Sequence, residues 1–210
     1  MLKRHWLMKS EPDAFSIADL ARVKVEPWTG VRNYMARNYM REMQVGDEVL
    51  FHHSNATPPG VAGLARVVRT GVIDETQFDP ASPYFDPKAT RATSQWDCVE
   101  VAYVATLSHL VSMDRLRADP PLADMLVLRK GMRLSVQPVT EAEYLRIVAL
   151  GQTAPSSAAA PVRTPAPVRT PAAKAGMAPA AKRGTAPAAK TGKAPAAKAG
   201  KAPAAKARAR

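Results

Sequence analysis

The charged residues of this chain are distributed very unevenly. Residues 152–210 carry 12 Lys and Arg side chains and no Asp or Glu, whereas residues 1–151 carry 18 basic and 18 acidic side chains. The last 59 residues also contain 23 Ala and 9 Pro but no Phe, Trp, Tyr, Leu or Ile. Such a segment buries too little apolar surface to offset the entropy cost of ordering. We therefore predict a disordered tail at 152–210 and one folded domain at 1–151, which is long enough for a hydrophobic core.

The tail consists of short repeats that carry cations. APVRTP occurs at 160–165 and 166–171, and an eight-residue unit ending in Lys occurs four times between 175 and 206. A mobile chain of positive charges binds phosphates without recognising base edges. The composition resembles the Lys-Ala-Pro tails of linker histones and histone-like bacterial proteins, although a solubilising linker or a tether to anionic membranes has a similar composition. The predicted phosphate-binding residues are Lys174, Lys182, Arg183, Lys190, Lys193, Lys198, Lys201 and Lys206.

The composition of residues 1–151 excludes several classes of protein. A single cysteine, Cys98, excludes an intrachain disulfide framework and a cysteine-rich metal site. No apolar run approaches the roughly 18 residues of a membrane span, and the run at 6–8 is too short for a signal peptide. We therefore expect a soluble, monomeric protein in a reducing compartment. It would be cytoplasmic, associated with the nucleoid in a bacterium and nuclear in a eukaryote.

Helix and strand signals alternate along the folded part. Ser16 with Asp19, and Thr140 with Glu143, have the spacing of capping boxes that begin helices. Asn33 is a candidate N-cap for a helix that continues to about residue 43, and a short helix is predicted at 112–117. Strands are predicted at 5–8, 48–53, 61–69, 96–107 and 134–139, with a long proline-containing loop at 74–94. This pattern predicts an α+β fold with a small barrel or curled sheet.

No catalytic motif is present in the sequence. It contains no glycine-rich phosphate loop, no GxSxG and no HExxH. His52 and His53 are adjacent on a predicted strand, so they point to opposite faces and cannot easily share a metal ion. Cys98 lies in an apolar strand, as an unreactive core thiol would. We therefore expect neither an enzyme nor a bound metal or cofactor.

Four segments together resemble the EVE domain, a member of the PUA-like superfamily. They are WLMKSEP at 6–12, WTGVRNYMARN at 28–38, HSN at 53–55 with PPG at 58–60, and RLSVQPV at 133–139. They occur in the same order as in the family, over residues 4–150. The resemblance implies a barrel of five or six strands flanked by short helices. It also implies a non-catalytic module whose concave pocket accepts a modified base, such as 5-methylcytosine, in DNA or RNA, in some cases with a separate nuclease as partner.

The resemblance places the base pocket on a small set of residues. Trp28 would stack on the base, and Asn33 and Arg32 would supply donors and acceptors to its edge. Lys9 could neutralise a phosphate, and Val31 or Leu134 could contact a methyl group. The predicted pocket residues are Lys9, Ser10, Trp28, Val31, Arg32, Asn33, His53, Ser54, Asn55 and Leu134.

Each of these residues also has a structural interpretation. Trp28 could be a core residue and Asn33 a helix cap, while Arg32 could form an ion pair, for example with Glu42. Ser10 could satisfy only its own turn, and His53 could be a structural histidine. The chain also departs from frequent residues of the family at three positions, where it has Thr29, Met35 and His52.

Two other functions are compatible with the sequence. In the first, the tail compacts DNA and the domain serves only as a folded anchor. In the second, the protein is a nuclease or a base-modifying enzyme. The enzyme has the weaker support because the sequence offers no nucleophile, metal set or cofactor loop.

Overall fold

A computed structural model describes residues 3–154, and the predicted basic tail lies outside these residues except for its first three positions. The elements follow one another in the order β1 (His5–Ser10), α1 (Ile17–Val23), β2 (Val25–Pro27), α2 (Tyr34–Glu42), β3 (Glu48–His53), β4 (Gly60–Ile73), β5 (Asp97–Ser112), α3 (Met113–Arg117), β6 (Val136–Val139) and α4 (Glu141–Gln152). Short 3-10 helices lie at Glu75–Gln77, Pro120–Leu122 and Leu126–Leu128. The predicted α+β class is therefore confirmed. Within residues 3–154, no helix has the length and apolar character needed to cross a bilayer.

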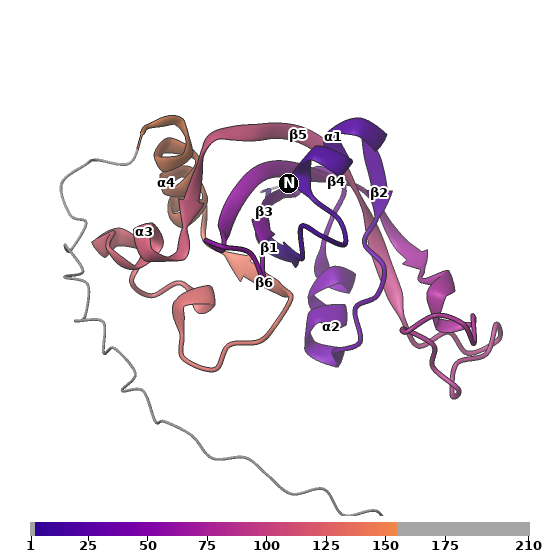
Figure 1. Cartoon of the computed structure of the whole chain (residues 1–210). Coiled ribbons are helices and arrows are strands. Elements are labelled where there is room, and N and C mark those ends of the chain that lie inside the picture. The colour runs from indigo at the N-terminus through magenta and orange to yellow at the C-terminus, as the bar shows by residue number, and fades with distance from the viewer. Residues whose placement is uncertain (1–2, 155–210) are drawn as a thin grey trace, which may run out of the picture. The chain divides into compact units, whose positions relative to one another are not determined.

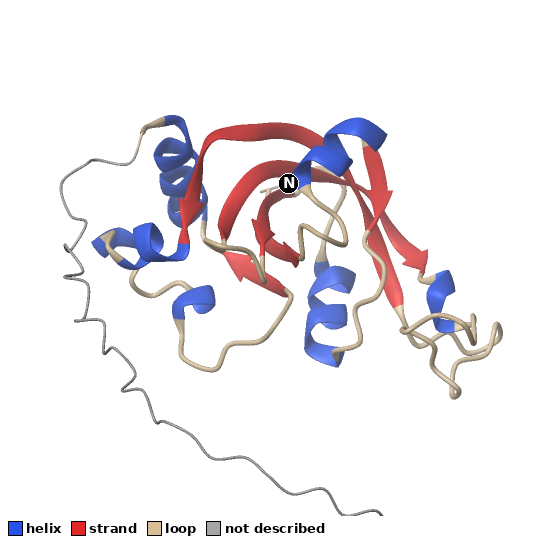
Figure 2. Ribbon diagram, in the orientation of Figure 1, coloured by secondary structure: helices blue, strands red, loops and turns tan. Residues whose placement is uncertain are grey.

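The strands form one six-stranded sheet in the order β2-β5-β4-β3-β1-β6. β1 pairs with β3 in parallel, and the other neighbouring strands are antiparallel. The register of β4 against β5 shifts at several points, and such bulges increase the bending of a sheet. The sheet curls strongly, as Figure 2 shows, and α2 contacts both β5 and β6 on its concave side (Figure 1).

The helices begin at the predicted capping residues. The Ser16 side chain accepts a hydrogen bond from the backbone N–H of Asp19, whose carboxylate accepts one from Ser16 N–H, and Thr140 with Glu143 forms the second such box. Asn33 Oδ1 accepts from the N–H groups of Met35 and Ala36 and caps α2. These bonds satisfy amide groups that the first helical turn leaves without partners.

The core lies on both faces of the sheet, because side chains alternate along the strands. Met8 of β1 belongs to the same buried cluster as Trp28 and Phe51, whereas the preceding Leu7 belongs to a second cluster with Ile147 of α4. The first cluster includes residues of α2, so this helix packs against the same face that carries Trp28.

The structure differs from the predicted elements in several places. Strand β2 was not predicted, and β4 and β5 extend beyond the predicted strands to residues 60–73 and 97–112. Strand β6 begins at Val136, so Leu134 precedes it, while Pro138 lies on an edge strand as its missing N–H requires.

The loop after β4 is irregular, as its prolines predicted, but it is firmly held. The amide of Gln77, which is fully buried, donates to the carbonyls of Asp74 and Trp96 and accepts from the N–H groups of Gln95 and Trp96. The Trp96 indole in turn donates to Asp86 at 2.7 Å. These bonds join the two ends of the loop to each other and fix its conformation.

Candidate functional site

A cavity of about 1190 Å³ lies beside the connection between β2 and α2. Eight of the ten predicted pocket residues line it, namely Lys9, Ser10, Trp28, Val31, Arg32, Asn33, Ser54 and Asn55. The remaining lining residues are Glu11, Ala14, Phe15, Glu26, Pro27, Thr29, Gly30, Tyr84, Arg133 and Ser135. Residues from distant parts of the sequence therefore meet at one hollow, although His53 and Leu134 are not among them.

The cavity has two walls that come from different edges of the sheet. Residues 26–33, which connect the edge strand β2 to α2, form the first wall together with Tyr84. The second wall comes from the end of β1 and from the residues that follow β3 and precede β6, which are Lys9, Ser10, Ser54, Asn55, Arg133 and Ser135. Two backbone hydrogen bonds hold this second wall together, from Ser54 N–H to Ser10 O at 2.9 Å and from Lys9 N–H to Ser135 O at 2.8 Å.

Trp28 serves the core and the cavity at once. Its side chain is only 7% exposed and packs edge-on against Phe51, with 5.3 Å between the ring centroids. Its backbone N–H donates to Val99 O at 2.8 Å, which continues the pairing of β2 with β5. Trp28 nevertheless also lines the cavity, so its place in the core is compatible with a position at the pocket.

The donors of Arg32 are already occupied by the protein. Its Nε donates to Tyr84 O at 2.7 Å, Nη1 to Asp74 Oδ2 at 2.7 Å, and Nη2 to Thr76 Oγ1 at 2.9 Å. The ion pair that Arg32 forms is therefore with Asp74 and not with Glu42, which lies 3.7 Å from Arg4 instead. Arg32 is placed to orient the cavity wall more than to donate to a ligand.

Asp74 connects the first wall to the loop after β4. It is 2% exposed and accepts hydrogen bonds from Gly30 N–H, Arg32 and Thr76. Burial raises the pKa of Asp74, but the hydrogen bonds from Arg32, Thr76 and Gly30 outweigh burial and leave this pKa below its ordinary value. Asp74 is thus held as a carboxylate at neutral pH.

Tyr84 completes the first wall, although it was not among the predicted pocket residues. Gly30 has a φ of +80°, and a Cβ atom at this position would lie 2.9 Å from the Tyr84 ring. A glycine is therefore required twice, for the backbone conformation and for the approach of the ring. Tyr84 remains 44% exposed, so much of the ring is free to contact a ligand.

Asn33 and Ser10 each have one group engaged by the backbone. Asn33 Oδ1 lies 2.9 Å from Met35 N and 3.1 Å from Ala36 N, while its Nδ2 has no protein partner within residues 3–154. The Ser10 hydroxyl donates to Phe15 O at 2.7 Å. What remains on the cavity side is an amide donor at Asn33 and a hydroxyl oxygen that can accept at Ser10.

The second wall is cationic. Lys9 is half-buried, and burial lowers its pKa from the ordinary value. Neither Lys9 nor Arg133 forms an ion pair in the described part of the chain. Arg133 is exposed and lies two residues before Ser135, which faces Lys9. The two carboxylates that also line the cavity, Glu11 and Glu26, form no ion pair with these cations. The cationic groups of Lys9 and Arg133 are therefore available to an anionic group in the cavity.

The two predicted residues outside the cavity have structural contacts. His53 Nε2 accepts a hydrogen bond from Ile17 N–H at 3.1 Å, and its ring packs edge-on against Phe51. Leu134 packs against the core cluster that contains Trp28. Their predicted contact with the cavity is therefore not observed, because His53, at the end of β3, contacts Ile17 and Phe51, and Leu134, which precedes β6, packs against the core.

Other candidate groups give no second site. His52 is buried beside Met113, and burial, with smaller effects from Lys9 and His53, lowers its pKa to about 4. Burial raises the pKa of Cys98 to about 12, as expected for an unreactive core thiol. Among residues 3–154, no group of three or more His, Cys, Asp or Glu side chains could hold a metal ion.

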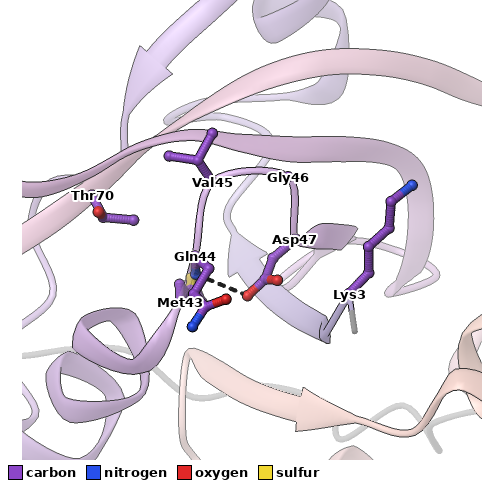
Figure 3. Close-up of a pocket in the computed structure, with 7 residues that line it drawn as sticks. All are labelled: Lys3, Met43, Gln44, Val45, Gly46, Asp47 and Thr70. Atoms are coloured by element: carbon purple, nitrogen blue, oxygen red, sulfur yellow. Dashed lines mark hydrogen bonds between the residues drawn. The ribbon is translucent and has the colours of Figure 1, made fainter. Parts of the chain in front are cut away.

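A smaller hollow of about 350 Å³ lies around the turn between α2 and β3 (Figure 3). Asp47 accepts there from Gln44 N–H at 3.0 Å and from the Trp6 indole at 2.9 Å. The Asp47 carboxylate therefore has internal partners, and its contacts hold the turn in place.

Known proteins resemble this chain over most of the described residues. Human thymocyte nuclear protein 1 is 36% identical over 177 residues, which cover 74% of this chain and 77% of the human protein. A solved structure of a hypothetical protein from Leishmania major is 49% identical, with a TM-score of 0.70, and covers 72% of this chain and 96% of that one. The structure of human THYN1 protein in complex with 5-methylcytosine containing DNA is 36% identical, with a TM-score of 0.68, and covers 73% of this chain and 100% of that one.

The family model of the EVE domain matches residues 4–150, which include every residue that lines the large cavity. The chain therefore belongs to the EVE domain family.

Proposed function

We propose that this protein binds DNA without catalysis and captures one extruded, modified base, such as 5-methylcytosine, in the large cavity. The observation that carries the proposal is the pairing of an aromatic wall, Trp28 and Tyr84, with a cationic wall, Lys9 and Arg133, around one hollow. The relative of known structure that binds 5-methylcytosine containing DNA supports the choice of polymer and modification.

The first wall has the chemistry that a flat heterocycle needs. Stacking of a base on an aromatic side chain contributes about 1–3 kcal/mol, whatever the base. Val31, which is 8% exposed and lines the cavity, offers an apolar contact for a methyl group. Asn33 Nδ2 can donate to an acceptor on the edge of the base.

The second wall suits the sugar-phosphate backbone. The cavity volume of about 1190 Å³ exceeds the roughly 300–1,000 Å³ of typical small-molecule pockets, so a nucleotide fits together with part of its strand. Lys9 and Arg133 lack carboxylate partners within residues 3–154 and would neutralise the phosphates that flank the extruded base. The base would thus lie against the aromatic wall of the cavity, and the sugar-phosphate backbone of its DNA strand would lie against the cationic wall.

The tail would supply affinity that does not depend on sequence. Residues 1–151 have 18 basic and 18 acidic side chains, so the domain has little net attraction for a polyanion, whereas residues 152–210 carry 12 cations. Tethering the cavity to these cations makes base capture an intramolecular event and raises its effective concentration. Compaction of DNA by the tail, with the domain as anchor, is the second candidate function, and the charge excess of the tail favours it.

The decisive experiment compares two neighbouring aromatic residues. Tyr84 lines the cavity and is 44% exposed, while Phe85 is 40% exposed and does not line it. Fluorescence anisotropy of the full-length protein on duplexes with and without one 5-methylcytosine gives the preference for the modified base. Tyr84→Ala should reduce affinity for the methylated duplex by about tenfold, and Phe85→Ala should not. Equal effects of the two variants, or a wild-type protein without preference, would contradict base capture.

A further inference from the structure

Glu26 is a carboxylate on the aromatic wall that the protein itself leaves without a partner. It is half-buried and lines the large cavity. No ion pair or side-chain hydrogen bond engages this carboxylate anywhere in residues 3–154. By contrast, the buried Asp74 nearby in the fold is fully engaged by Arg32, Thr76 and Gly30. The acceptor lone pairs of Glu26 are therefore available to a ligand.

The pairing of β2 with β5 places Glu26 beside Trp28. Glu26 lies opposite Val101, and Trp28 N–H donates to Val99 O, so residues 26–28 are one extended segment. Alternate residues of such a segment point to the same face, with Cα atoms about 7 Å apart. Val99 and Val101 belong to the same buried cluster as Trp28, which identifies this face as the inner one. Glu26 and Trp28 therefore lie on the same face of this segment, and both line the cavity.

Asn33, a second polar residue of this wall, offers a hydrogen-bond donor where Glu26 offers an acceptor. Because Asn33 Oδ1 caps α2, the free part of its side chain is the Nδ2 donor. The wall therefore offers an acceptor at Glu26 and a donor at Asn33. A cytosine edge carries an amino donor beside a ring nitrogen acceptor, and acidic side chains accept from this amino group.

From this arrangement, and resting on the function proposed above, we propose that Glu26 accepts a hydrogen bond from the exocyclic amino group of the bound base. The cavity then selects 5-methylcytosine over thymine, which has the same ring and methyl group. Thymine has a carbonyl oxygen in place of the amino group, and this oxygen faces the carboxylate as a second acceptor. Its one ring N–H lies between two carbonyl oxygens, so turning the base does not remove the repulsion.

The test compares two nucleotides that differ only at this edge. Calorimetry of the full-length protein with 5-methyl-2′-deoxycytidine 5′-monophosphate and with thymidine 5′-monophosphate gives a ratio of dissociation constants. The phosphate is common to both, so contributions of the tail cancel in the ratio. The wild-type protein should prefer the cytidine nucleotide by about tenfold. In Glu26→Gln the amide can rotate and donate to the thymine oxygen, so the ratio should fall close to one.

Glu141→Gln is the matched control, because Glu141 is an exposed glutamate of α4 that does not line the large cavity. It should keep the wild-type ratio, and thermal unfolding should show that both variants remain folded. Equal binding of the two nucleotides by the wild-type protein overturns the role of Glu26 and leaves base capture intact. A ratio that Glu26→Gln does not change has the same meaning. A wild-type protein that binds neither nucleotide overturns the proposed function as well.

Discussion

Arg32 and Asp74 form an ion pair that ties the β2–α2 connection to the loop after β4, with 2.7 Å between Arg32 Nη1 and Asp74 Oδ2. The two residues are 42 positions apart in the sequence. Arg32 also donates to the carbonyl of Tyr84, so the same guanidinium that closes the ion pair holds the tyrosine that faces the cavity. The position of Tyr84 in the aromatic wall therefore depends on the Arg32–Asp74 ion pair, which is an interaction within the protein itself.

Removing the charge of Asp74 should destabilise the fold. Asp74→Asn leaves a guanidinium that is only 21% exposed without its counter-ion, and breaking such buried pairs costs about 3 kcal/mol. Denaturant unfolding measures the loss. Glu75→Gln is the control, because the Glu75–Arg91 pair is 62% and 73% exposed and contributes at most about 1 kcal/mol. A similar decrease in the free energy of unfolding in the two variants would show that the Arg32–Asp74 pair stabilises the fold no more than an exposed ion pair does.

Gly30→Ala should destabilise the protein and displace Tyr84. The new Cβ atom would lie 2.9 Å from the ring, and the φ of +80° is itself unfavourable for alanine by about 1–2 kcal/mol. Gly131→Ala isolates the backbone effect, because Gly131 has the same φ of +80° and nothing within 4 Å of its Cβ position. The free energy of unfolding should therefore fall further in Gly30→Ala. An equal decrease in the free energy of unfolding in both variants would mean that the Tyr84 ring moves away from the new Cβ atom at no energetic cost.

His52 should make the protein less stable as the pH falls from about 6.5 to about 4. Its pKa is about 4 in the folded protein and 6.5 ordinarily, so only the unfolded chain binds a proton in this range. The loss should reach about 3 kcal/mol and then stop, since both states are protonated below pH 4. Asp74, whose pKa lies below 3.8, loses its own contribution only in more acidic solution.

Urea unfolding between pH 7 and pH 4 gives this dependence directly. His52→Asn should reduce it strongly and leave the smaller contribution of His53, whose pKa burial also lowers. His109→Asn, at a histidine of β5 that is not buried, should leave the dependence in place. A dependence unchanged by His52→Asn would contradict the assignment to this residue.

Neutralising the tail should weaken DNA binding equally for all sequences. A full-length variant carries Gln at Lys174, Lys182, Arg183, Lys190, Lys193, Lys198, Lys201 and Lys206. Each phosphate contact contributes about 0.9 to the slope of log affinity against log salt concentration, so the slope should become shallower. The ratio of affinities for methylated and plain duplexes should stay the same. An unchanged slope would rule out the tail as the source of phosphate binding.

The fold was predictable where the signal is local. Ser16, Asn33 and Thr140 cap helices as predicted, because a capping side chain and its partners lie within three residues. Strand β2 was missed because Val25-Glu26-Pro27 contains a proline and is too short to show alternation. It is extended because β5 provides a partner for it, which is a tertiary effect.

Most of the predicted pocket residues do line the cavity, but the contacts among the lining residues were not predicted. The resemblance to the EVE domain indicated eight of the residues that line it. It did not place Tyr84 in the pocket, where a long loop brings this residue over Gly30, and it did not show that Asp74 engages a donor of Arg32. Such contacts join segments that are far apart in the chain, and the spacing of residues along the sequence does not predict them. The roles of the lining residues in binding remain predictions.

The aromatic wall leads directly into α2, the helix that contacts both β5 and β6 across the concave side of the sheet. A ligand bound against Trp28 and Asn33 therefore opposes any detachment of this helix. Occupancy of the cavity should slow the exchange of α2 amide hydrogens with solvent deuterium, while those of α4, which packs on the opposite face, keep their rates. The helix thus links ligand capture to local opening of the fold.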